Sequence, residues 1–205
     1  MNSDQKKYLK TLVETHGSPG FEERVQEVFR QRVSEACDSV TTDVMGSVTA
    51  CRNEKGKVKV LLDGHSDEIG FLVTYVDDNG YLWFTPSGGW DPEVVVSQRV
   101  LVHTMKGPIS GVIGKKAIHL MDPDDRKKKS ELHNLWIDIG AKDGDEAREM
   151  VRVGDPITMD APFREVLGGR VVAKSFDNRI GLYAVSETLR GVSKKMKAAL
   201  YGVSA

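Results

Sequence analysis

The sequence predicts an α/β domain interrupted by a β-rich insertion, and three observations lead to this fold class. Apolar residues recur at helical spacing near the start of the chain, and short strand-like segments separated by turn residues fill its middle. A strand, a helix and another strand then follow from about residue 169 to residue 205. Because helix and strand patterns alternate at both ends of the chain, we expect the two ends to form one domain.

Two helices are predicted at the start of the chain. The first covers about Asp4–Glu14, with leucines and a valine on its apolar side. Pro19 and Gly20 interrupt it, because both residues break helical continuity. A second helix follows, with Glu22 and Glu23 in its first turn, where carboxylates interact favourably with the helix dipole.

Strand patterns begin at about Ser39. The segments SVTTDVMGSVTACR and KVKVLL predict two strands joined by a turn at NEKG. Short strands are predicted after Gly70, in FLVTYV, YLWFTP, RVLVHT and ISGVIG, and the turn segments DDNG, PSGG and MKGP separate them. This pattern is typical of a small barrel or sandwich. LWIDIGA, a short helix near DGDEAREM and the strand DPITM continue this region. We assign residues 70–164 to the insertion and residues 1–69 and 165–205 to the α/β domain.

The composition is that of an ordinary globular protein. The 205 residues are 40% hydrophobic and 29% charged, and the net charge of −1 gives no reason to expect nucleic acid or an acidic membrane as a partner. No apolar stretch has the length of a membrane span, and the N-terminus MNSDQKKYLK is too polar for a signal peptide. Cys37 and Cys51 form no CxxC pair, so we expect a reduced, cytoplasmic setting.

Metal-competent side chains follow the strand pattern in LLDGHSDEIGF. His65 and Asp67 come at the carboxyl end of a predicted buried strand, where open α/β sheets bind ligands. At this spacing a metal-binding imidazole can be held by the neighbouring carboxylate through its other nitrogen. A surface turn and a capped helix are the alternatives, and Glu68 by itself is interpreted as solvated.

Asp177 is the second candidate metal ligand. It follows the predicted strand GRVVAKSF and opens a helix, where aspartate is also a favoured cap. A carboxylate at this place can bridge two divalent metals while His65 binds one of them. Capping and metal binding both remain open from the residues alone.

Several segments together resemble the M42 metallo-aminopeptidases, a family that includes glutamyl and deblocking aminopeptidases. They fall in order from about residue 15 onward: GHSDEIGF, GGWDPEVV, QRVLVHT, GVIGKKAIHL, LWIDIGA, VRVGDPITM and GGRVVAKSFDNRIG. The resemblance implies a zinc-peptidase-like α/β domain, here incomplete, interrupted by an inserted β-barrel domain. It implies that His65 is a metal ligand, that Asp67 is the catalytic carboxylate orienting it, and that Asp177 bridges two metal ions, zinc or cobalt. It also implies peptide substrates and assembly into large homo-oligomers through the insertion.

The sequence departs from the family pattern at two places. Gly64 and Ser66 stand where other residues are more usual around the histidine. In the family, the strand matching AALYGVSA continues into two adjacent glutamates, a general base and a ligand, and later ligands follow. This sequence ends at Ala205, so we expect a truncated product, a fragment or a degenerate relative that is inactive by itself and prone to aggregate because this last strand has an uncovered edge.

Two alternatives to a peptidase remain open. One is a non-catalytic module that keeps the insertion for assembly. The other is a hydrolase of another bond, either an N-acyl group or a glycoside.

Overall fold

The computed structural model describes residues 1–193 and 195–205, which divide into two compact units. The first unit consists of Met1–Glu68 and Pro162–Ala205, and the second consists of Ile69–Ala161. The helices are α1 (Ser3–Glu14), α2 (Glu23–Val33), α3 (Pro92–Val95), α4 (Gly144–Met150) and α5 (Phe176–Gly191). The strands are β1 (Ser39–Thr42), β2 (Val48–Arg52), β3 (Lys59–Gly64), β4 (Gly70–Val76), β5 (Leu82–Ser87), β6 (Arg99–Thr104), β7 (Gly107–Gly114), β8 (Trp136–Asp138), β9 (Pro156–Met159), β10 (Arg164–Val166), β11 (Arg170–Val172) and β12 (Ala199–Ser204).

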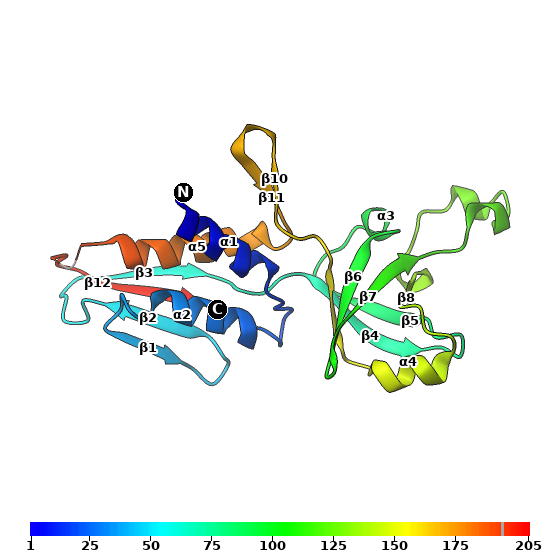
Figure 1. Cartoon of the computed structure of the whole chain (residues 1–205), viewed down its shortest axis with the longest axis horizontal. Helices are drawn as coiled ribbons and strands as arrows, with labels where there is room; N and C mark the ends of the chain where they lie inside the picture. The colour runs from blue at the N-terminus through cyan, green and yellow to red at the C-terminus, as the bar shows by residue number, and fades with distance from the viewer. Residues whose placement is uncertain (194) are drawn as a thin grey trace. The chain divides into compact units, whose positions relative to one another are not determined.

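The first unit is a helix-covered sheet with the strand order β1-β2-β12-β3 (Figure 1). The pairs β1–β2 and β2–β12 are antiparallel, whereas β12 and β3 are parallel. Helices α1, α2 and α5 share one core with this sheet, formed around Leu12, Phe29, Leu182, Leu189 and Leu200. The predicted α/β class is therefore confirmed.

The segment 39–52, predicted as one strand, is a hairpin of β1 and β2. The side chain of Asp43 accepts hydrogen bonds from the backbone N–H groups of Met45 and Ser47, at 2.9 and 3.0 Å. Gly46 has φ of 95°, a left-handed conformation that glycine adopts without steric cost. This turn chemistry interrupts a run of strand-forming residues, and it produces two strands from one sequence pattern.

The last strand is an interior strand, contrary to the prediction that its edge would be uncovered. β12 is bonded to β2 on one side and to β3 on the other. The edges of this sheet are β1 and β3, and Val60 and Leu61 of β3 are 40% and 65% exposed. The prediction was wrong because sequence order does not specify where a strand inserts into a sheet.

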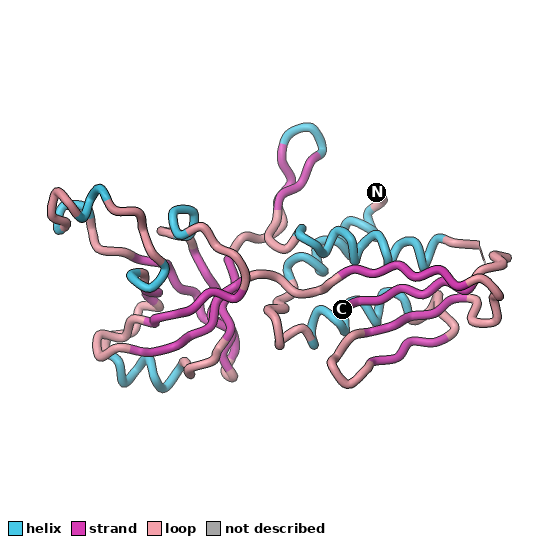
Figure 2. Tube along the Cα trace, turned by 180° about the vertical axis from the view of Figure 1, so that it is seen from behind, coloured by secondary structure: helices cyan, strands magenta, loops and turns pink. Residues whose placement is uncertain are grey.

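The second unit is a group of strands (Figure 2) that closes into a barrel. The strand order around the barrel is β4-β5-β8-β7-β6-β9. Its core is formed by buried side chains such as Phe71, Leu82, Val100, Ile137 and Ile157. Closure pairs β4 with β9 and β6 with β9, so that no strand is left with a free edge. A barrel, not a sandwich, is thus the observed form of the β-rich region.

The predicted strand GRVVAKSF is only three residues long and does not join the main sheet. β11 pairs with β10 in a separate two-stranded hairpin, which Figure 1 shows apart from the four-stranded sheet. Gly168 and Gly169 make the turn, with φ of 74° and 69°. Because the glycine pair folds the chain back on β10, Asp177 does not follow a strand of the main sheet, as the sequence pattern had suggested.

No helix among residues 1–193 and 195–205 combines the length and apolar character needed to cross a membrane. Cys37 and Cys51 are both free thiols, and burial raises the pKa of the Cys37 thiol to about 11.

Candidate metal centre

The loop that carries His65 begins at the carboxyl end of the parallel pair β3 and β12. The register places Ser204 opposite Gly64, so the two strands end together. Ser66 N–H donates to the carbonyl of Ala205 at 2.8 Å, and Ala205 N–H donates to the carbonyl of Gly64 at 3.2 Å. Carboxyl ends of parallel strands are where α/β sheets bind ligands. The loop is therefore held by backbone bonds at a position suited to a site.

His65 and Asp67 are in direct contact. The Nδ1 atom of the imidazole lies 2.6 Å from Oδ1 of Asp67, and the two side chains are 46% and 33% exposed. A carboxylate bound to Nδ1 fixes the tautomer that presents Nε2 as the metal-binding nitrogen. The exposed ring can thus offer Nε2 to a ligand at the surface of the unit.

Asp177 lies in an irregular first turn of α5. Ser175, not Asp177, is the N-cap residue, and its φ of 63° is left-handed, which is uncommon for a residue other than glycine. Asp177 itself has φ of −90° and ψ of 107°, outside the helical region, and the peptide bond to Asn178 is cis. The structure therefore does not support the interpretation of Asp177 as a helix cap.

Glu68 is buried, which overturns its interpretation as a solvated side chain. Only 4% of the residue is exposed, and Lys174 Nζ lies 2.6 and 2.7 Å from its two carboxylate oxygens. Ser175 Oγ donates to Oε2 at 2.7 Å, and Gly17 N–H donates to Oε1 at 3.3 Å. One carboxylate thus binds the loop of His65 to the two residues that precede Phe176 and Asp177.

Arg179, which follows Asp177 in the sequence, makes a second connection to the loop of His65. Its side chain is fully buried, and Nε donates to the carbonyl of Ser66 at 2.7 Å. The guanidinium also donates to backbone carbonyls of Leu12, Thr15 and Gly17, and Nη2 lies 3.4 Å from Oε1 of Glu68. Bonds from residues 174, 175 and 179 therefore join the segment of Asp177 to the segment of His65.

Burial lowers the pKa of Lys174 and of Arg179, and the Glu68 carboxylate opposes that shift in both cases. We refer to Glu68, Lys174, Ser175 and Arg179 as the buried network. Local sequence patterns do not reveal this network, because each member is an ordinary surface residue type. The available signal was the placement of Lys174 and Arg179 beside apolar runs.

The donor chemistry of His65 and Asp177 fits a divalent metal such as zinc, cobalt or manganese. Among the residues that the structure describes, no three His, Cys, Asp or Glu side chains lie together as a metal-binding group. The residues present thus supply imidazole and carboxylate ligands for a metal without forming a complete shell.

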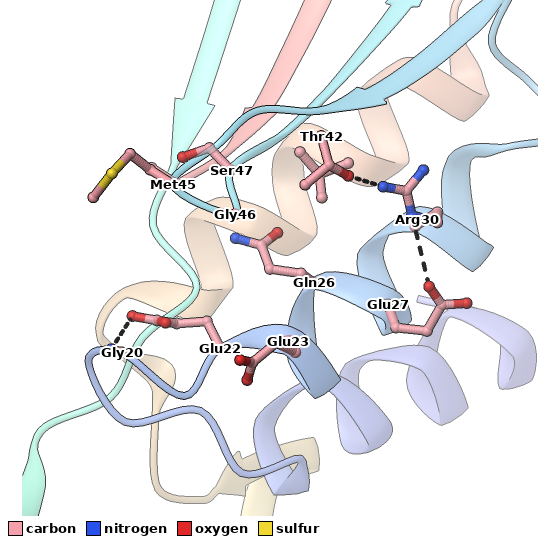
Figure 3. Close-up of a pocket in the computed structure, with 12 residues that line it drawn as sticks. Gly20, Glu22, Glu23, Gln26, Glu27, Arg30, Thr42, Met45, Gly46 and Ser47 are labelled. Atoms are coloured by element: carbon pink, nitrogen blue, oxygen red, sulfur yellow. Dashed lines mark hydrogen bonds and ion pairs between the residues drawn. The ribbon is translucent and has the colours of Figure 1, made fainter.

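A different hollow in the same unit lies between α2 and the turn from β1 to β2 (Figure 3). Its volume is about 340 Å³, and neither His65 nor Asp177 lines it. Its polar groups bind one another: Glu22 accepts from Gly20 N–H at 2.8 Å, and Arg30 lies 3.6 Å from Glu27. This hollow is therefore distinct from the candidate metal centre.

Comparison with protein families identifies the chain. Residues 46–205 match the model of the M42 glutamyl aminopeptidase family. The chain belongs to this family. It is 35% identical over 197 residues to FrvX of Escherichia coli K12, an alignment that spans 95% of this chain and 55% of FrvX.

Solved M42 structures share the fold. The TET aminopeptidase of the Thaumarchaeota archaeon SCGC AB-539-E09 superposes with a TM-score of 0.93 at 37% identity, over 98% of this chain and 58% of that one. The TET1 peptidase of Pyrococcus horikoshii, which can assemble into a tetrahedron or a large octahedral shell, gives 0.87 at 31% identity, over 98% and 60%. The chain thus spans a little more than half the length of these relatives.

Proposed function

We propose that this M42 chain carries part of a two-metal aminopeptidase site that removes N-terminal residues from peptides. The observation that carries the proposal is the His65–Asp67 pair at the carboxyl end of β3, joined to the segment of Asp177 by buried bonds. Family membership supports the reaction class.

Each side chain has a distinct part in this proposal. His65 would hold a metal through Nε2, and Asp67 holds the ring from Nδ1 and would stabilise its charge. Asp177 would be the carboxylate shared by the metals, and it lies in the irregular first turn of α5. Zinc or cobalt, when bound, supplies Lewis acidity and lowers the pKa of water.

The buried network acts as support for this site. Glu68 and Arg179 fix the segments of His65 and Asp177 against each other, and ligand segments held in place in this way need little ordering when metal binds. We propose these two residues as positioning residues.

We also propose that the whole protein self-associates through the barrel unit, in a cytoplasmic setting, with peptides as its partners. The named assemblies of the Pyrococcus horikoshii TET1 peptidase support self-association. The free thiols of Cys37 and Cys51 are in keeping with a cytoplasmic setting. The net charge of −1 is in keeping with peptides as partners.

Cobalt titration of the 205-residue chain tests the site. Calorimetry and the visible absorption of Co²⁺ should show binding that Asp67→Asn weakens by about 10- to 100-fold and that His65→Ala weakens at least as much. His133→Ala is the matched control, because His133 lies in the barrel unit and its side chain is 74% exposed. Equal affinity of the His65→Ala and His133→Ala proteins would refute the assignment. Self-association without any cobalt binding would favour the non-catalytic assembly module.

A further inference from the structure

The barrel unit contains a cavity that the aminopeptidase proposal does not use. Its volume is about 740 Å³, within the range of ligand-binding pockets. It is formed by β5, by β8 and by the connection of residues 115–135 that joins β7 to β8. None of His65, Asp67 and Asp177 lines it.

Two tryptophans form an apolar part of the lining. The ring centroids of Trp83 and Trp136 are 6.3 Å apart, and the rings are tilted by 51°. Nε1 of Trp83 donates to Asp77 at 3.3 Å, so the polar edge of this indole is already bonded. Gly114 is needed beside Trp136, because a Cβ atom there would lie 2.8 Å from its Nε1. The aromatic surface is thus held by specific contacts.

Much of the remaining wall is cationic. Five cationic side chains and one carboxylate line the cavity: Lys115, Lys116, Arg126, Lys128, Lys129 and Glu131. The carboxylate of Glu131 already lies 3.2 Å from Nε2 of His133. In a chain whose net charge is −1, such a group produces a local positive potential that concentrates anions.

Hydrogen bonds hold this wall in place. Lys115 Nζ donates to Ser130 Oγ at 3.1 Å, and Ser130 N–H donates to Oε1 of Glu93 at 2.7 Å. The first bond spans the connection from its beginning to its later part, and the second ties it to α3. The cations therefore stand around a formed cavity beside an aromatic surface.

We propose that this cavity binds acidic segments of peptides. Side-chain carboxylates would pair with Lys115, Lys116 and Lys129, and neighbouring apolar side chains would pack on the tryptophans. The choice of peptides among anions rests on the proposed function, since an aminopeptidase encounters peptides. The cavity would then favour substrates rich in glutamate or aspartate through contacts other than those made by the metals.

The test uses the full 205-residue chain and a peptide that an aminopeptidase site cannot process. The probe is acetyl-Glu-Glu-Leu-amide, and acetyl-Gln-Gln-Leu-amide is its neutral counterpart. Binding is followed by calorimetry and by tryptophan fluorescence, since two of the three tryptophans line the cavity. Because the probe has no free amino terminus and no metal is added, failure here is separate from failure of the metal-site proposal.

We expect saturable binding of the acidic peptide at low salt, binding at least about tenfold weaker for the neutral peptide, and loss of affinity as salt is raised. The double substitution Lys115→Glu with Lys129→Glu should weaken binding by about tenfold or more. The matched control is Lys55→Glu with Lys57→Glu, two exposed lysines of the first unit, which should bind like wild type.

Three results would overturn the proposal. They are equal affinity for both peptides, an equal loss of affinity for the acidic peptide in the control variant, and binding of ATP, tested as a non-peptide anion, by a protein that does not bind the acidic peptide. Circular dichroism of both double variants shows that the barrel remains folded, and tryptophan quenching in the wild type places the probe at this cavity.

Discussion

Replacing Glu68 by glutamine tests the buried network most directly. The substitution preserves shape but removes the charge that Lys174 Nζ contacts at 2.6 and 2.7 Å. The Glu68 and Lys174 side chains are only 4% and 10% exposed, so water cannot replace the lost partner. Removing one member of a buried ion pair costs about 3–5 kcal/mol. We expect Glu68→Gln to lower the free energy of unfolding by that amount.

The matched control is Glu165→Gln. Glu165 forms a contact of similar length, 2.5 Å to Lys6 Nζ, but the two side chains are 64% and 36% exposed. Exposed pairs contribute less than about 1 kcal/mol, so this variant should unfold nearly like wild type. The comparison separates the effect of burial from that of contact geometry. Urea unfolding monitored by circular dichroism measures the free energy of unfolding of both variants.

A double variant identifies the group that is left unpaired. Arg179 keeps its bonds to backbone carbonyls when Glu68 changes, whereas the ammonium of Lys174 loses its carboxylate. Glu68→Gln combined with Lys174→Met should therefore be more stable than Glu68→Gln alone. Equal urea midpoints for Glu68→Gln and Glu165→Gln would refute the reasoning, as would a double variant no more stable than the single one.

Four further outcomes are expected. Residues 70–164 expressed alone should unfold cooperatively with a β-type circular dichroism spectrum, and a disordered product would contradict an autonomous barrel. The 205-residue chain alone, assayed with zinc or cobalt beside His65→Ala, should release few or no amino acids from unblocked peptides, since a catalytic zinc takes about three protein ligands; robust turnover lost in that control would contradict this. Burial lowers the pKa of His16 from 6.5 to about 4, so the unfolded chain takes up this proton first and stability should fall as pH falls between those values, less steeply in His16→Gln. Leu61→Lys on the exposed edge strand β3 should reduce the fraction of aggregated chain in sedimentation, and an unchanged fraction would argue against aggregation through that edge.

The β-rich unit could be predicted because its signals are local, although they left a barrel and a sandwich both open. Turn residues such as those of DDNG and MKGP separate strands that pair mostly with near neighbours, as β4 does with β5 and β6 with β7. The contact between His65 and Asp67 is equally local, since the residues are two positions apart. The strand order of the four-stranded sheet could not be predicted from local signals, because β12 comes from the far end of the chain and inserts between β2 and β3.

The α/β class, the β-rich insertion and the contact of His65 with Asp67 follow from local sequence patterns, whereas the residues left a barrel and a sandwich both open. Tertiary packing decided that Glu68 is buried against Lys174 and that Arg179 donates to the carbonyl of Ser66. Glu68 and Lys174 are 106 positions apart, and Arg179 and Ser66 are 113 positions apart. A carboxylate is solvated or buried according to what the rest of the chain packs against it, and the energy of a buried charge depends on partners that local patterns do not specify.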